Sequence, residues 1–220
     1  MVDEASWERH GALSGVGFVV LLVIAVALAG TGTQPSDSAD EVRRYYADNQ
    51  DMLRVSAYLG GLATIPFLWF LGSLARALRP ASARLATTAT ASGVAATAFF
   101  GAGLAVSAAL ALSVNRQVDA TTIEFLGALI ASLISYASFA AASLTLAVGV
   151  VALRYRVLPA WLAWLSLLAT ATGLVGALQI ARESDGLAAF GFVALGVFLA
   201  WVLALAITLY RQGDTAPGRT

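Results

Sequence analysis

Two groups of charged, polar and small residues have the spacing that places side chains on one face of a helix. Steps of three and four residues do this because one helical turn takes about 3.6 residues. The first group is Asp51, Arg54, Tyr58 and Gly61, and the second is Thr172, Gly176, Gln179 and Glu183. If the two faces meet, they form an outward-open polar pocket with Arg54 as its cation, and we predict a ligand-binding site there.

Glu124 and Tyr136 extend this candidate site. Glu124 begins the fourth apolar segment at the same depth, and Tyr136 shares a helical face with aromatic and serine residues, namely Phe125, Ser132, Ser135, Phe139 and Ser143. That face either lines a ligand cavity or packs against another helix through its serines and small neighbours. The charged residues have a simpler interpretation, because each lies near a predicted helix end, where charges cap the helix or reach water.

The residue types missing from the chain exclude several kinds of chemistry. All 13 basic residues are arginine, so no lysine can form a Schiff base or bind phosphates in a P-loop. There is no cysteine for a disulfide or a thiolate site, and the one histidine, His10, cannot form a histidine cluster. The hydrolase motifs His-Glu-x-x-His and Gly-x-Ser-x-Gly are also missing. We therefore predict no catalytic residues, cofactor or metal, and favour a non-enzymatic protein.

The composition is that of an integral membrane protein. Hydrophobic residues make up 59% of the 220 residues and charged residues 12%, against about 45–50% and about 25% in soluble domains. The formal net charge is zero, so there is no basic surface for nucleic acid. The residues of the candidate site must therefore be positioned by helices that cross a lipid bilayer.

Six apolar segments are long enough to cross or nearly cross the hydrocarbon core of a bilayer, which is about 30 Å thick. They lie at about 13–30, 51–79, 84–112, 122–154, 158–181 and 187–210. Together they predict a single domain over residues 1–220, an all-α membrane bundle of six helices. The first segment has an alternative interpretation as a cleaved signal peptide, although the residues before it are acidic on balance, unlike those of a signal peptide.

The polar residues between the first two spans predict a short amphipathic helix outside the membrane, at about 39–48. Ser38 and Glu41 have the spacing of a capping box, in which each side chain bonds to the main chain of the other residue. Arg44 lies four residues from both Asp40 and Asp48, and we expect ion pairs at both spacings.

The distribution of arginines predicts the orientation in the membrane. With six spans, both termini lie on the same side. The termini and the loops of that side hold eight arginines, whereas the loops of the other side hold five. Because basic loops stay in the cytoplasm, we predict a plasma-membrane protein whose N- and C-termini are cytoplasmic.

The segment from Leu158 to Trp164 reads Leu-Pro-Ala-Trp-Leu-Ala-Trp and enters a glycine-containing span. It resembles the Leu-Pro-x-Trp-Leu-x-Trp segment of small, uncharacterised, multi-spanning bacterial membrane proteins of the domain-of-unknown-function type. The polar block with its Tyr45-Tyr46 pair before a long helix is similar to theirs as well. The resemblance implies a helical membrane bundle and brings no activity or catalytic residue with it.

Long faces of small residues are the strongest functional signal, because such residues let helices approach closely in lipid. We therefore predict a multi-pass protein that acts by helix association or as an accessory or binding subunit. Its partners would be membrane lipid and either a second copy or another membrane protein. The alternative is a small-molecule or lipid transporter or binding protein that uses the pocket between the second, fourth and fifth spans. All 13 acidic residues lie in loops or near helix ends, which argues against a pump.

Overall fold

The computed structural model describes residues 4–30, 32–33, 37–113, 118–182 and 184–215, and this part of the chain is helical with no strand. The helices are α1 (Glu4–Ala29), α2 (Ala39–Asp48), α3 (Gln50–Leu78), α4 (Ala83–Ser113), α5 (Ala120–Tyr155), α6 (Ala160–Ala177) and α7 (Asp185–Thr215). A 3₁₀ turn, η1 (Leu178–Ile180), continues α6. All of these helices except α2 and the short turn are long and apolar enough to cross a membrane.

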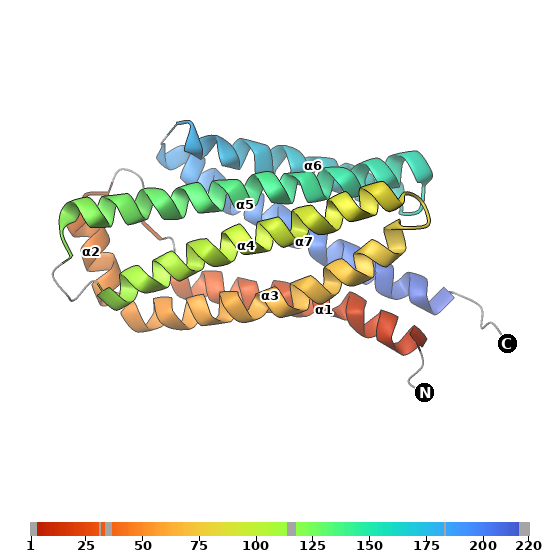
Figure 1. Ribbon diagram of the computed structural model, residues 1–220, viewed down its shortest axis with the longest axis horizontal. Helices are drawn as coiled ribbons and strands as arrows, with labels where there is room; N and C mark the ends of the chain where they lie inside the picture. The colour runs from red at the N-terminus through yellow and green to blue at the C-terminus, as the bar shows by residue number, and fades with distance from the viewer. Residues whose placement is uncertain (1–3, 31, 34–36, 114–117, 183, 216–220) are drawn as a thin grey trace.

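The protein is therefore an integral membrane bundle of six helices with a short seventh helix outside it, as predicted. Both chain ends lie at one end of the bundle, here called the terminal side, and α2 lies at the opposite end, here called the α2 side (Figure 1). The predicted boundaries agree with the observed helices to within a few residues, with two exceptions. Helix α1 begins earlier than the first apolar segment, and α7 ends later than the last one. These extensions add polar turns to the apolar spans.

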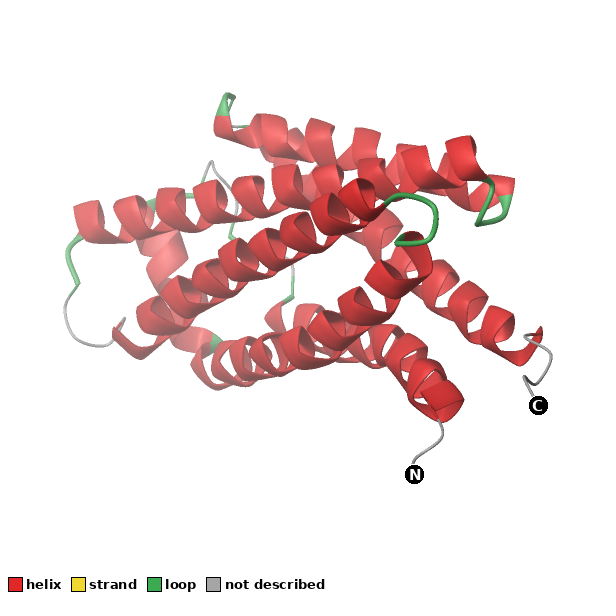
Figure 2. Cartoon of the chain, turned by 45° about the vertical axis from the view of Figure 1, so that its right-hand side comes forward, coloured by secondary structure: helices red, strands yellow, loops and turns green. Residues whose placement is uncertain are grey.

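The six long helices pack in a ring that follows the order of the chain. Helix α3 packs on α1 and α4, α5 packs on α4 and α6, and α7 packs on α6 and closes the ring against α1. Figure 2 shows the same bundle from a second direction, with long helices joined by short loops. Short connections such as the turn between α3 and α4 explain this order, because a short loop requires the two helices that it joins to pack side by side.

The best-packed part of the core lies toward the terminal side. Phe70 of α3, Val148 of α5 and Trp201 of α7 are fully buried there, and all the described buried side chains of α7 lie from Leu199 onward. The Trp201 indole Nε1 donates a hydrogen bond of 2.8 Å to the Ser166 hydroxyl, which itself donates to the main-chain oxygen of Leu162. These bonds satisfy polar groups that would be costly to leave unpaired in a core.

Helix α2 begins as the sequence predicts. Ser38 is its N-cap, and both halves of the capping box with Glu41 are formed. Hydrogen bonds from the Ser38 main-chain N–H and then from its hydroxyl hold the pKa of Glu41 below the ordinary carboxyl value. The predicted ion pairs of Arg44 are wrong, because its guanidinium instead donates to the main-chain oxygen of Asp40. Exposed ion pairs contribute little, so the cap governs where this helix starts.

Two tyrosines fasten α2 to the bundle. The hydroxyl of Tyr46 lies 3.1 Å from the hydroxyl of Ser107 on α4, and the hydroxyl of Tyr45 donates to the main-chain oxygen of Ala29 at the end of α1. Burial is the largest influence on both phenols, and it raises the pKa of each above the ordinary tyrosine value. Gln50 adds a bond of 2.7 Å to the main-chain oxygen of Ala111. Helix α2 therefore packs against the bundle instead of lying free at its surface.

Candidate functional site

The structure does not assemble the pocket that the sequence predicts between the second, fourth and fifth spans. In the ring, α3 packs on α1 and α4, whereas α6 packs on α5 and α7, so the polar faces of α3 and α6 do not meet. The prediction that they converge is wrong. The physical reason is that helical spacing defines which residues share a face, but the order of packing decides which faces meet.

The predicted site residues of α3 lie exposed near the α2 side. The Arg54 guanidinium is 3.7 Å from the Asp51 carboxylate, and the two side chains are 52% and 96% exposed. Such exposed pairs add little stability, and their position in the first turns of α3 agrees with the simpler interpretation of a charged helix end. Tyr58 is 70% exposed one turn further on. Their role as ligand-binding residues stays a prediction.

The other described residues of the predicted site lie on helices that do not pack on α3. Gln179 lies half-buried in η1, and Glu124 is exposed in the second turn of α5. Glu183 lies outside the described residues. Thr172 donates its hydroxyl to the main-chain oxygen of Leu168 on its own helix. The three described side chains, those of Gln179, Glu124 and Thr172, therefore do not form one site with Arg54.

Tyr136 does lie in a cluster, on the outer surface of α4 and α5. Its ring is 5.6 Å from that of Phe99 on α4 and 6.3 Å from that of Phe139. The side chain of Tyr136 is 50% exposed, and its hydroxyl has no hydrogen-bond partner among the described residues. On the same helix, the hydroxyl of Ser143 lies 2.8 Å from that of Ser92, which confirms the helix-packing interpretation for this serine.

Small residues of α4 continue this aromatic cluster toward the α2 side. Ala98, Ala102 and Ala105 are all exposed, and they recur at spacings of three and four residues. We call the combined surface of these three alanines with Phe99, Tyr136 and Phe139 the α4–α5 face. It offers a shallow strip next to a row of rings, which is a shape that a further helix can fit closely.

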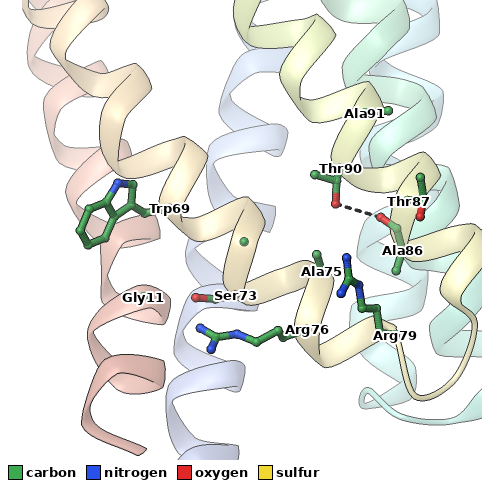
Figure 3. Close-up of a pocket in the computed structure, with 11 residues that line it drawn as sticks. Gly11, Trp69, Ser73, Ala75, Arg76, Arg79, Ala86, Thr87, Thr90 and Ala91 are labelled. Atoms are coloured by element: carbon green, nitrogen blue, oxygen red, sulfur yellow. Dashed lines mark hydrogen bonds between the residues drawn. The ribbon is translucent and has the colours of Figure 1, made fainter. Parts of the chain in front are cut away.

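The structure also contains a groove that the sequence analysis missed, at the terminal side of α1, α3 and α4 (Figure 3). Its volume is about 690 Å³, within the range of about 300–1,000 Å³ that is usual for small-molecule sites. It is lined by Gly11 of α1, by Trp69, Gly72, Ser73, Ala75 and Arg76 of α3, by Arg79 of the turn after α3, and by Ala86, Thr87, Thr90 and Ala91 of α4. We call it the terminal groove.

Two close helix crossings bound the terminal groove. A Cβ added to Gly11 would lie 2.1 Å from the Ser73 hydroxyl oxygen, so α1 and α3 touch there. A Cβ added to Gly93 would lie 2.6 Å from a methyl carbon of Leu71, so α3 and α4 touch deeper in the bundle. Gly72, in contrast, has open space where its Cβ would be. The groove therefore lies over Gly72, where no side chain fills the surface of α3.

The walls of the terminal groove are apolar and its terminal-side end is basic. The hydroxyls of Thr87 and Thr90 donate to main-chain oxygens of their own helix, at 3.0 and 2.9 Å, which leaves their methyl groups as the contact surface. Figure 3 shows Arg79 directed into the space between α3 and α4 and Arg76 directed toward α1. The arrangement can bind an amphiphile, and the residues that line it include no carboxylate or histidine that could act as a general base.

One sequence signal could have pointed to the terminal groove. The chain has no acidic residue from position 52 to position 118, while Arg76, Arg79 and Arg84 lie close together in the sequence around the turn between α3 and α4. In the orientation count these arginines only helped to decide the side of the membrane. The lack of any acidic residue along the same hairpin is what marks them as a basic cluster in the sequence.

No metal site or match to a known protein adds to this picture. Among the described residues, no group of three or more His, Cys, Asp or Glu side chains could hold a metal ion. No protein-family model, curated protein or solved structure matches the chain. The resemblance of the Leu158–Trp164 segment to multi-spanning bacterial proteins therefore stays a prediction.

Proposed function

We propose that this chain is a multi-pass protein of the plasma membrane that acts without catalysis, by lateral association with a second copy of itself through the α4–α5 face. The observation that carries the proposal is the Tyr136 hydroxyl, which is exposed on that face and lacks a hydrogen-bond partner in the described chain. Both termini are cytoplasmic in this proposal, in keeping with the arginines of the terminal side.

The depth of Tyr136 gives this observation its weight. It lies between Glu124 and Arg154, the charged residues near the two ends of α5. At about 1.5 Å per residue, Tyr136 is about 18 Å from the first and about 27 Å from the second, and about 5 Å from their midpoint. A hydroxyl at that depth faces hydrocarbon, where a polar group without a partner is costly. A helix of a second copy would supply the missing partner.

The shape of the α4–α5 face supports a close helix contact. Exposed alanines at Ala98, Ala102 and Ala105 would let two α4 helices approach until their backbones nearly touch, which is how small residues favour association in lipid. A two-fold dimer is the commonest symmetric assembly, and it uses the same surface on both subunits. The rings of Phe99 and Phe139 would then pack at the edge of that contact.

The absence of cysteine from the chain makes the proposal directly testable. Ala98, Ala102 and Ala105 are replaced by cysteine one at a time, and the variants are oxidised in native membranes. We expect a disulfide-linked dimer from at least one of these variants. Leu174→Cys is the matched control, since this residue is 45% exposed on α6, away from the face, and it should give no disulfide-linked dimer.

Each outcome of the crosslinking decides the proposal. Monomers from all three α4 variants, or equal crosslinking of the Leu174→Cys control, would refute association through this face. A crosslink to a different protein would replace the second copy by a partner membrane protein. Tyr136→Phe provides a second measurement. A symmetric dimer would lose one interhelical hydrogen bond of about 0.6 kcal/mol in each subunit, about 1.2 kcal/mol in all, which should weaken dimerisation about eight-fold. No change in the dimerisation constant would refute the role of the hydroxyl.

A further inference from the structure

The terminal groove has the length of one membrane leaflet. Along α3 it extends from Trp69 to Arg79, which is about 15 Å at 1.5 Å per residue. The hydrocarbon core of a bilayer is about 30 Å thick, so the groove covers about half of it. Arg79 lies in the turn after α3, at the water end of the groove, while Trp69 lies toward the middle of the bundle.

The walls of the groove suit hydrocarbon. Ala91 is exposed on one wall and Trp69 is 55% exposed at the inner end. The threonines between them have used their hydroxyl protons within α4, at Thr87 and Thr90. An acyl chain lying over Gly72 would therefore contact methyl, methylene and ring carbons and would leave no donor of these threonines unpaired.

The water end of the groove suits a phosphate. Arg76 lies in the last turn of α3, and Arg79, three residues later, is the C-cap of that helix and keeps a helical conformation. Their side chains therefore lie on neighbouring parts of the same surface. Arginine binds phosphate oxygens through two parallel N–H donors. The Arg79 guanidinium makes no hydrogen bond or ion pair to any described residue, and Arg84 adds a third positive charge in the first turn of α4. No carboxylate occurs on this hairpin between positions 52 and 118.

We propose that the terminal groove binds an anionic phospholipid from the leaflet of the terminal side, with its phosphate at Arg79 and Arg76 and one acyl chain over Gly72. Basic pockets between membrane helices bind anionic headgroups in this way. The groove is separate from the α4–α5 face, which lies further along α4 toward the α2 side. The lipid site therefore does not depend on whether the protein forms a dimer.

The charge of the groove is tested with phosphatidylglycerol, an anionic phospholipid, against zwitterionic phosphatidylcholine. The full chain is placed in nanodiscs, and the motionally restricted fraction of each spin-labelled lipid is measured. The wild type should prefer phosphatidylglycerol. Arg79→Gln should lower that preference about five-fold, the effect of about one basic residue at an anionic surface. Arg154→Gln, which removes the same charge from the terminal end of α5 outside the groove, should leave the preference unchanged.

The shape of the groove is tested without changing any charge. Gly72→Leu fills the open space over α3, and Gly61→Leu is the matched control, since Gly61 lies on the same helix, is exposed, and has nothing within 4 Å of its added Cβ either. Both changes replace a poor helix former by a good one, so both variants should fold. We expect Gly72→Leu to abolish the restricted phosphatidylglycerol signal and Gly61→Leu to retain it.

Three results would overturn the proposal. Equal loss of preference in Arg79→Gln and Arg154→Gln would mean that general surface charge attracts the lipid. A Gly72→Leu variant that binds phosphatidylglycerol like the wild type would mean that the groove is not occupied by a chain. If inorganic phosphate at millimolar concentration binds the wild type while the wild type shows no preference for phosphatidylglycerol, the site binds free phosphate and not a phospholipid.

Discussion

Replacing Ser166 with alanine should destabilise the bundle by removing a hydrogen-bond partner from a fully buried tryptophan. The Trp201 side chain is 0% exposed, and its Nε1 donates to the Ser166 hydroxyl across the α6–α7 interface at 2.8 Å. An orphaned buried donor costs about 1–3 kcal/mol, while interhelical hydrogen bonds in membranes average about 0.6 kcal/mol. We therefore expect the free energy of unfolding to fall by about 1–2 kcal/mol, which changes the unfolding equilibrium about five- to thirty-fold.

The measurement is reversible unfolding in mixed micelles, followed by far-ultraviolet circular dichroism, with Ser138→Ala as control. Ser138 also donates to a main-chain oxygen of its own helix, that of Ile134 at 3.0 Å, but it receives no bond from another helix among the described residues. Its replacement should cost only a few tenths of a kcal/mol. Trp201→Phe completes a double-mutant cycle, because Ser166 stays bonded to its own helix and no polar group is orphaned. Equal costs for both serines, or a coupling energy near zero, would refute the reasoning.

Three further predictions concern α1 and α2. Ser38→Ala should destabilise α2 by about 1 kcal/mol through loss of its cap, measured as about five-fold faster hydrogen exchange of the α2 amides, and unchanged exchange would contradict the role of the cap. Because the pKa of Glu41 is lowered, its contribution to the stability of α2 is complete above the ordinary carboxyl pKa and is lost as pH falls through the lowered value. The protection of the α2 amides against hydrogen exchange, corrected for intrinsic rates, should therefore fall in acid. It should fall less in Ser38→Ala. Gly15→Val should lower the free energy of unfolding by about 1–3 kcal/mol through overpacking, because its Cβ would lie 2.8 Å from a ring carbon of Phe70 and 2.9 Å from the methyl carbon of Ala206. Gly17→Val should be tolerated, because the nearest atom to its Cβ lies 3.8 Å away. Equal unfolding midpoints for the two glycine variants would show that α1 can shift freely.

The terminal groove and the α4–α5 face place two surfaces at different depths on the same helix. Thr87 and Ala91 line the groove near the terminal side, while Ala102 and Ala105 lie on the association surface further along α4. A single helix rich in small residues can contribute to both surfaces. Its short side chains leave the groove open near the terminal side, and further along they let a second subunit approach closely. Variants of the two surfaces should therefore act independently on lipid preference and on dimerisation.

Tyr136 shows where reasoning from the sequence stops. Its helical face was recognised from spacing, but two outcomes stayed open, a ligand cavity or a helix contact. The structure divides that face: Ser143 bonds across to α4, whereas Tyr136 stays exposed beside Phe99. Periodicity places residues on one side of a helix, yet only the neighbouring helices determine how much of that side is covered.

The sequence by itself determined the features that arise from local physics. Runs of apolar residues longer than a bilayer core require membrane helices, and the Ser38 and Glu41 pair places the start of α2, since a cap involves only residues one turn apart. Tertiary structure alone decided that Arg54 and Gln179 lie apart and that Gly72 underlies an open groove. The reason is that apolar helices in lipid have many compatible neighbours, so which faces meet depends on the packing of all six together.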